Sequence, residues 1–204
     1  KEKPDLPVIT GDMPDTWIHG YMSMPKETKL SKELQRKTYN TEIMNTQMNQ
    51  WLGVHNSIDR YIDKAVENMI LFDEHTFGVA MTHGDQHKWT YNDEFKINKS
   101  LGDYDFIETS WNEKGERIRK ADRIVGSLMK KQMKDLAKSV ATEGKRIVVY
   151  NSLPWSRNGK VKFFAGVYEK DFKIYGLKDI NTGKEIPVYN NYNLISFEAE
   201  NIPS

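Results

Sequence analysis

The spacing of apolar residues changes once along the chain, near Lys145, and this change constrains the fold more than any other feature. Before it, apolar residues recur at steps of three and four, which predicts helices with one buried face. After it they tend to alternate with polar residues, which predicts strands. The 204 residues are therefore expected to form an α+β multidomain chain, with a three-helix bundle followed by a partial β-sandwich.

Two of the three predicted helices are long and have clear limits. The first begins at Pro25 and ends near Gly53, because proline is favoured at a helix start and glycine at a helix end. The last spans residues 108–140. Residues 79–108 are polar and lack a sustained period, so we expect a long loop there, and the helical bundle is assigned to 26–144.

The middle helix is predicted within residues 57–78, ends just after His75, and carries the most informative histidine. Ser57 is a suitable N-cap, and Gly78 stands where a left-handed residue would end the helix. His75 is the next position on the apolar stripe of this helix, directly after Asp73 and Glu74. It is either a histidine that interacts with the carbonyl groups and dipole of the helix end, or a ligand of a bound group.

The segment 145–204 is predicted to be the β part of the chain. Its expected strands cover residues 146–150, 160–167, 174–179, 184–189 and 194–199. Asn181, Thr182 and Gly183 separate the third and fourth strands and indicate a hairpin.

Carboxylates and further histidines supply other candidate site residues. Asp12 follows a short apolar run and Gly11, so it is placed to hold a carboxylate at a sheet edge, with Asp15 nearby. Both side chains would otherwise shape turns through hydrogen bonds to the backbone. His83 and His87 are four residues apart, which suits either a metal pair on a helix or a surface loop.

Composition excludes several classes of function. Lys and Arg total 30 against 29 Asp and Glu, so we expect no nucleic acid and no membrane surface as a partner. The chain has no cysteine, which removes disulfides, thiolate metal sites and cysteine nucleophiles. No run reaches the length of a membrane span, and the first residues lack the apolar core of a signal peptide.

Four sequence segments together resemble glycoside hydrolase family 38, the zinc-dependent retaining α-mannosidases and their relatives. They are Gly11-Asp12 followed by Thr16-Trp17-Ile18-His19-Gly20-Tyr21, then Asp73-Glu74-His75-Thr76-Phe77-Gly78, Asn151-Ser152-Leu153-Pro154-Trp155-Ser156-Arg157, and Phe197-Glu198-Ala199-Glu200-Asn201-Ile202-Pro203. They occur in the order in which the family has them, and the string that begins at Asn151 is the most specific.

The resemblance implies that the chain is a fragment of a larger hydrolase of α-mannosides or related glycosides. Residues 1–25 would be the tail of the catalytic barrel, 26–144 the helical domain, and 145–204 the start of the β-sandwich. His75 would be one zinc ligand, and Asp12, with Asp15 in reserve, the acid/base carboxyl. The nucleophilic aspartate and the other zinc ligands would lie outside the chain, so the fragment alone would be inactive.

A second hypothesis is a non-catalytic helical and β module that binds carbohydrate or protein. Asp12 and His75 would then be structural, and exposed Trp and Tyr side chains in the β part would support binding there. A shared catalytic cleft instead requires Asp12 and His75 to lie within about 10 Å of each other.

Overall fold

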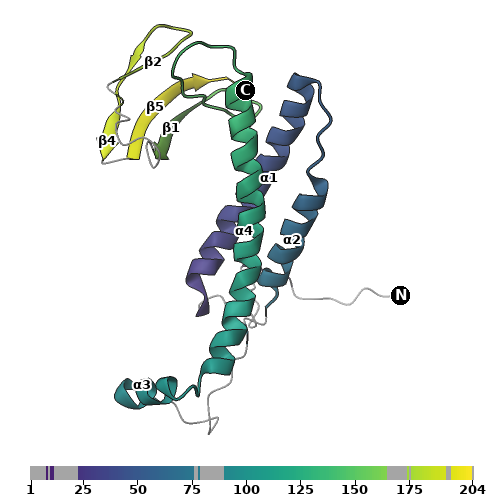
Figure 1. Cartoon of the computed structure of the whole chain (residues 1–204), viewed down its shortest axis with the longest axis vertical. Coiled ribbons are helices and arrows are strands. Elements are labelled where there is room, and N and C mark those ends of the chain that lie inside the picture. The colour runs from purple at the N-terminus through teal and green to yellow at the C-terminus, as the bar shows by residue number, and fades with distance from the viewer. Residues whose placement is uncertain are drawn as a thin grey trace. The chain divides into compact units, whose positions relative to one another are not determined.

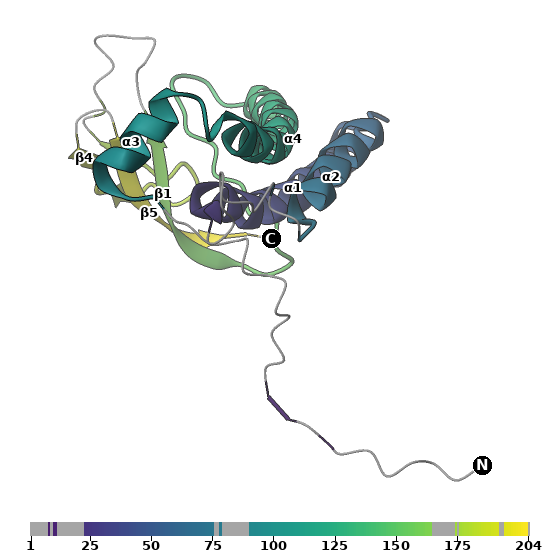
Figure 2. The same cartoon turned by 90° about the horizontal axis from the view of Figure 1, so that it is seen from below.

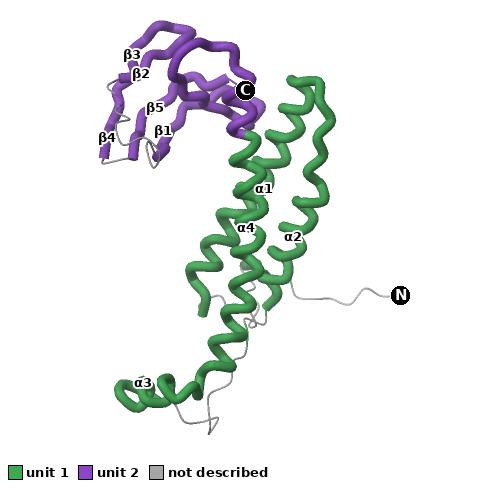
Figure 3. Tube along the Cα trace, viewed as in Figure 1, with its two compact units in different colours: residues 1–132 green, residues 133–204 purple. Residues whose placement is uncertain are grey.

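A computed structural model describes residues 8, 10–11, 23–75, 78, 90–164, 174, 176–191 and 194–203. These residues form four helices and five strands, with the strands in small antiparallel sheets, which confirms the α+β class. The chain divides into two compact units, residues 1–132 and 133–204 (Figure 3). The limit between them falls inside α4 (Asp105–Ser139), whereas the sequence pattern changes near residue 145.

The first two predicted helices are present, but the limits of only the first were predicted correctly. α1 (Pro25–Leu52) has the predicted limits, and Gly53 adopts the left-handed conformation with φ 63°. α2 (Asp59–Asp73) is shorter than predicted, because Glu74 has an extended backbone with ψ 135°. The predicted continuation of this helix through His75 is therefore wrong, and His75 lies outside the helix.

The first unit has an apolar core to which α1, α2 and α4 contribute. The three helices lie side by side in both cartoon views (Figures 1 and 2). The core residues are Met24, Leu34, Ala65, Met69, Phe72, Ile118, Ala121 and Val125. Those on α2 and on α4 recur at helical spacing, so the apolar stripes of these two helices are their buried faces. No helix among the described residues is long and apolar enough to cross a membrane.

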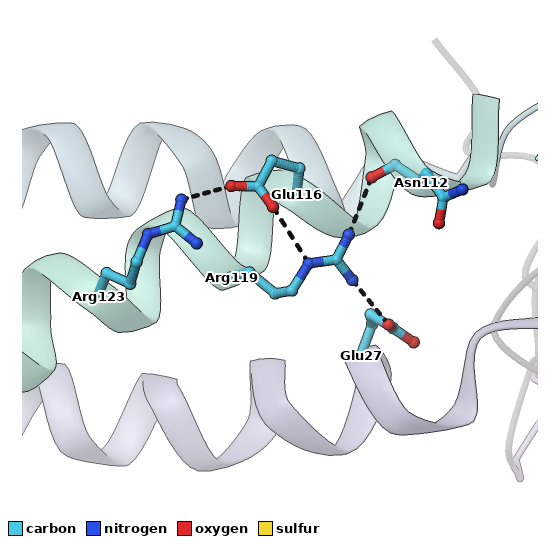
Figure 4. Close-up of polar contacts among 5 residues, drawn as sticks. All are labelled: Glu27, Asn112, Glu116, Arg119 and Arg123. Carbon is cyan, nitrogen blue, oxygen red and sulfur yellow. Dashed lines mark hydrogen bonds and ion pairs between the residues drawn. The ribbon is translucent and has the colours of Figure 1, made fainter. Parts of the chain in front are cut away.

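A charged network also joins α1 to α4 (Figure 4). The Arg119 guanidinium donates to Glu27 Oε1 at 3.0 Å, to Glu116 Oε2 at 3.2 Å and to the Asn112 carbonyl at 3.1 Å. Glu116 also accepts from Arg123, and the hydrogen bonds from Arg123 and Arg119 lower its pKa below the ordinary value.

A short helix replaces part of the predicted loop over residues 79–108. α3 (Asn92–Ser100) has no buried residue, and α4 begins at Asp105 rather than at 108. The loop prediction is wrong for these segments, because a helix without a buried face has no apolar stripe to reveal it. His83 and His87 lie outside the described residues.

The predicted strand over residues 146–150 is not formed. Arg146 instead donates to the carbonyls of Thr142 at 2.7 Å and Ala137 at 3.0 Å, which ties this segment to the chain around the end of α4. The apolar run of the segment favours a strand locally, but a strand forms only when a partner strand takes up its backbone hydrogen bonds.

The other four predicted strands are present at least in part, and the one over residues 184–189 is divided between two short strands. β1 (Arg157–Phe164), β5 (Leu194–Ile202) and β4 (Tyr189–Asn191) form an antiparallel sheet in the order β1-β5-β4. β2 (Leu177–Lys178) pairs with β3 (Glu185–Ile186), which confirms the predicted hairpin. Ile195, Phe197 and Ala199 alternate along β5 and are buried, as expected for a strand with one covered face.

Asn151 closes the turn before β1. Its side-chain amide donates to the carbonyls of Trp155 at 2.8 Å and Pro203 at 3.1 Å, and its Oδ1 accepts from the Leu153 backbone at 3.2 Å. Asn151 is only 8% exposed, so these bonds take the place of hydration. The turn is thereby joined to the residues at the end of β5.

Candidate functional site

The candidate site lies where the chain leaves the C-terminal end of α2. Asp73 is the last residue of the helix, and its Oδ1 accepts a 2.9 Å hydrogen bond from Ser31 Oγ on α1. The next residue, Glu74, keeps one helical bond from its backbone N–H to the Ile70 carbonyl, at 3.0 Å. The side chain of Asp73 therefore joins the C-terminal end of α2 to α1.

Lys114 on α4 holds the same segment from another side. Its Nζ donates to the Glu74 carbonyl at 2.6 Å and to Glu74 Oε2 at 3.1 Å. The side chain of Lys114 is only 10% exposed, so it is largely withdrawn from water. A cation at the C-terminal end of a helix also interacts favourably with the helix dipole, so Lys114 stabilises this end of α2 in two ways.

His75 stands next to this pair with its ring partly in solvent. Its Nδ1 lies 3.0 Å from Glu74 Oε1, and its side chain is 54% exposed. The prediction that His75 continues the apolar stripe is wrong, because the helix has already ended. Lys114, Glu74 and His75 thus form a chain of contacts that runs from α4 to an accessible imidazole, and we call these three residues the Lys114–Glu74–His75 relay.

Gly78 is the next described residue and packs directly on α4. It has the left-handed φ predicted for it, 73°, but lies five residues beyond the end of the helix. A Cβ atom at this position would lie 2.4 Å from Trp111 Cδ1 and 2.8 Å from Ser110 Oγ. Only glycine fits here, so the segment that carries His75 is closely apposed to α4.

The nitrogen and oxygen donors of this site suit zinc, although they provide few ligands. Zinc binds neutral imidazole and carboxylate groups, and its histidine ligands commonly donate the second ring N–H to a carboxylate, as Glu74 is placed to accept from Nδ1. His75 therefore fits as one ligand, through Nε2. The described ranges contain no group of three or more His, Asp or Glu that could hold a metal. A zinc site at His75 needs ligands from elsewhere.

The carboxylates predicted for catalysis are not placed by the structure. Asp12 and Asp15 lie outside the described residues, so their distance from His75 stays a prediction. Sequence reasoning missed Lys114 and Ser31. The available signal for Lys114 was its position three residues after Trp111 and four before Ile118, which places a lysine among the apolar residues of its helix.

A second feature lies in the unit formed by residues 133–204. A hollow of about 230 Å³ is lined by Asp179, Lys184, Glu185, Ile186, Pro187, Tyr189, Glu198 and Glu200. Tyr189 is 64% exposed, and Lys184 Nζ is 2.7 Å from Glu200 Oε2. Trp155 of the same unit is also exposed.

Comparison of the chain with protein-family models, with curated proteins and with solved structures gave no match in any of the three.

Proposed function

We propose that the chain is part of a zinc-dependent retaining glycoside hydrolase that acts on α-mannosides or related glycosides. The observation that carries the proposal is the half-exposed His75 ring, with its Nδ1 at a carboxylate and its position at the end of α2. Support also comes from the resemblance of the sequence around His75 and Asn151 to family 38. The finer fold, a three-helix bundle followed by a partial β-sandwich, belongs to the same proposal.

In this proposal each candidate residue has a separate task. His75 contributes one zinc ligand, and Glu74 orients its ring. When bound, zinc supplies Lewis-acid contacts to sugar hydroxyls. Asp12, with Asp15 in reserve, first protonates the leaving oxygen and then activates water, from about 5 Å across the sugar from a nucleophilic carboxylate. That nucleophile and the other zinc ligands come from outside this chain, so the 204 residues alone do not hydrolyse glycosides.

The test uses the intact hydrolase that the proposal implies. Wild type, His75→Ala and the control His55→Ala are compared for bound zinc and for release of the aryl group from an aryl α-mannoside. His55 is an exposed residue in the connection between α1 and α2. We expect His75→Ala to lose zinc and activity together, and His55→Ala to keep both. Retention of zinc and activity by His75→Ala would overturn the assignment.

The hollow at Tyr189 supports a second candidate, a non-catalytic module that binds carbohydrate. An exposed aromatic ring beside carboxylates and a lysine offers both a stacking surface and groups that bind sugar hydroxyls. Titration of the 204-residue chain with mannose oligosaccharides, followed by NMR, tests it. Binding that is lost in Tyr189→Ala but kept in Tyr61→Ala, an exposed tyrosine on α2, would favour this candidate.

A further inference from the structure

We propose that Lys114 is a positioning residue that, through Glu74, holds neutral His75 as the tautomer with its proton on Nδ1. The lone pair is then on Nε2, which is the ring nitrogen that can act as a ligand. The inference rests on the proposed function only for the identity of this ligand as zinc. The tautomer itself follows from the contacts of three residues.

The first step is the anchoring of Glu74 by Lys114. One ammonium group contacts both the main chain and the side chain of Glu74, at 2.6 Å and 3.1 Å. The side chain of Lys114 is about nine-tenths buried, whereas that of Glu74 is 44% exposed. The lysine therefore restricts the position of the carboxylate, and not the reverse. This contact restricts the rotamers that the half-exposed glutamate side chain can adopt.

The second step is the effect of Glu74 on the ring. Neutral imidazole has one N–H donor and one nitrogen with a lone pair. Glu74 Oε1 is 3.0 Å from Nδ1, and a lone pair on Nδ1 would repel the carboxylate at this distance. A proton on Nδ1 turns the contact into an attraction. Unconstrained histidine prefers the opposite tautomer, with the proton on Nε2, so the carboxylate reverses the intrinsic preference.

The third step links the tautomer to binding. Metal ligation uses an unprotonated ring nitrogen, and the partner of the other nitrogen sets which one is available. Lys114 does not touch such a ligand in this scheme. It acts on His75 by keeping Glu74 at Nδ1.

The experiment reads the tautomer by ¹⁵N NMR of the histidine side chains in the 204-residue chain, without metal, at about pH 9, where an ordinary histidine is neutral. We expect the Nδ1–H form to be the majority form of His75 in wild type. It should become the minority form in Lys114→Met and in Glu74→Ala. Lys114→Arg keeps the charge and should restore it, and Lys130→Met, an exposed lysine of the same helix, should leave it unchanged.

Glu74→Ala keeps the proposal testable if Lys114→Met disturbs the fold. Lys114 can still bind the main-chain carbonyl of residue 74 in this variant, so the end of α2 stays anchored while the carboxylate is gone. A majority of Nε2–H in wild type would overturn the proposal. So would an unchanged tautomer in both Lys114→Met and Glu74→Ala.

Zinc binding by the intact hydrolase provides a separate readout. Loss of an outer partner of a metal-bound histidine weakens metal affinity by about 10- to 100-fold, so we expect this loss in Glu74→Ala and a loss in the same direction in Lys114→Met. If the tautomer behaves as expected but the intact protein binds no zinc, the relay stands and the proposed function fails. If zinc binds in wild type and the tautomer is Nε2–H, the relay fails and the proposed function stands.

Discussion

Arg119 on α4 donates to Glu27 Oε1 on α1 across 3.0 Å, 92 residues apart in the sequence. The same guanidinium also binds the Asn112 carbonyl and Glu116, both on α4 (Figure 4). These two contacts orient the guanidinium toward α1. Gly115 lies against this contact, because a Cβ atom there would be 2.9 Å from Arg119 Nη1 and 3.0 Å from Met24 Cε. The first turn of α1 is thereby joined to α4 by a charged contact at the edge of the apolar core.

Breaking this contact should weaken the first unit modestly. We expect Arg119→Met to lower the free energy of unfolding by about 1 kcal/mol, since the pair is only partly exposed and belongs to a network. A double-mutant cycle with Glu27→Gln should give a coupling of about 0.5 kcal/mol that decreases as salt is added. Arg117→Met, an exposed arginine on the same helix, is the control. A coupling of zero would show that the contact contributes nothing.

A comparison of Gly53→Ala with Gly78→Ala tests whether Gly78 packs closely on α4 at the candidate site. Gly53 and Gly78 have similar φ values, 63° and 73°, but only Gly78 has neighbours that a Cβ would strike. Gly53→Ala should cost about 1 kcal/mol from backbone strain alone. Gly78→Ala should cost more, because Trp111 would have to move. Equal losses in urea unfolding of the two variants would contradict the packing of Gly78 on α4.

The amide of Asn151 should be essential to the β unit. Asn151→Asp keeps the acceptor for Leu153 but replaces the donor by a carboxylate that faces the carbonyls of Trp155 and Pro203. We expect a loss of about 2 to 3 kcal/mol, because a buried polar group then lacks its partner. Asn191→Asp, on exposed β4, should change the free energy little. Thermal unfolding followed by NMR signals of β5 is the measurement.

Asp179 should make the β2–β3 hairpin sensitive to acid. Backbone hydrogen bonds from Thr182 and Asn181 lower the pKa of this carboxyl. The stabilisation is therefore present above the ordinary aspartate pKa, about 3.9, and is lost as the pH falls through the lower folded value. Asp179→Asn should remove this dependence. A carboxyl ¹³C titration of Asp179 that gives an ordinary or raised pKa would contradict the turn geometry.

Local sequence signals predicted most of the helices and strands. Pro25 and Gly53 marked both ends of α1, and alternation marked β1 and β5, because these features depend on residues close in the chain. α3 escaped prediction because none of its side chains is buried. The run at 146–150 was wrongly predicted as a strand, since its own residues favour one while Arg146 is bound to carbonyls at and after the end of α4.

The candidate site was predicted only in part, because it depends on a contact between residues that are far apart in the sequence. The sequence indicated His75 as a candidate but placed it on a helix that ends two residues earlier. The residue that anchors the chain at this point is Lys114, 40 positions away, and its place among apolar residues of α4 does not identify Glu74 as its partner. Asp12 and Asp15 stay predictions.

The continuity of α4 has a practical consequence for dividing the protein. The limit between the two compact units, at residues 132 and 133, falls on helical backbone and not on a linker (Figure 3). A cut there would leave the carbonyl groups of the final helical turn without N–H partners and would remove residues 133–139 from their own helix. Separate expression of the N-terminal half should therefore extend at least to Ser139.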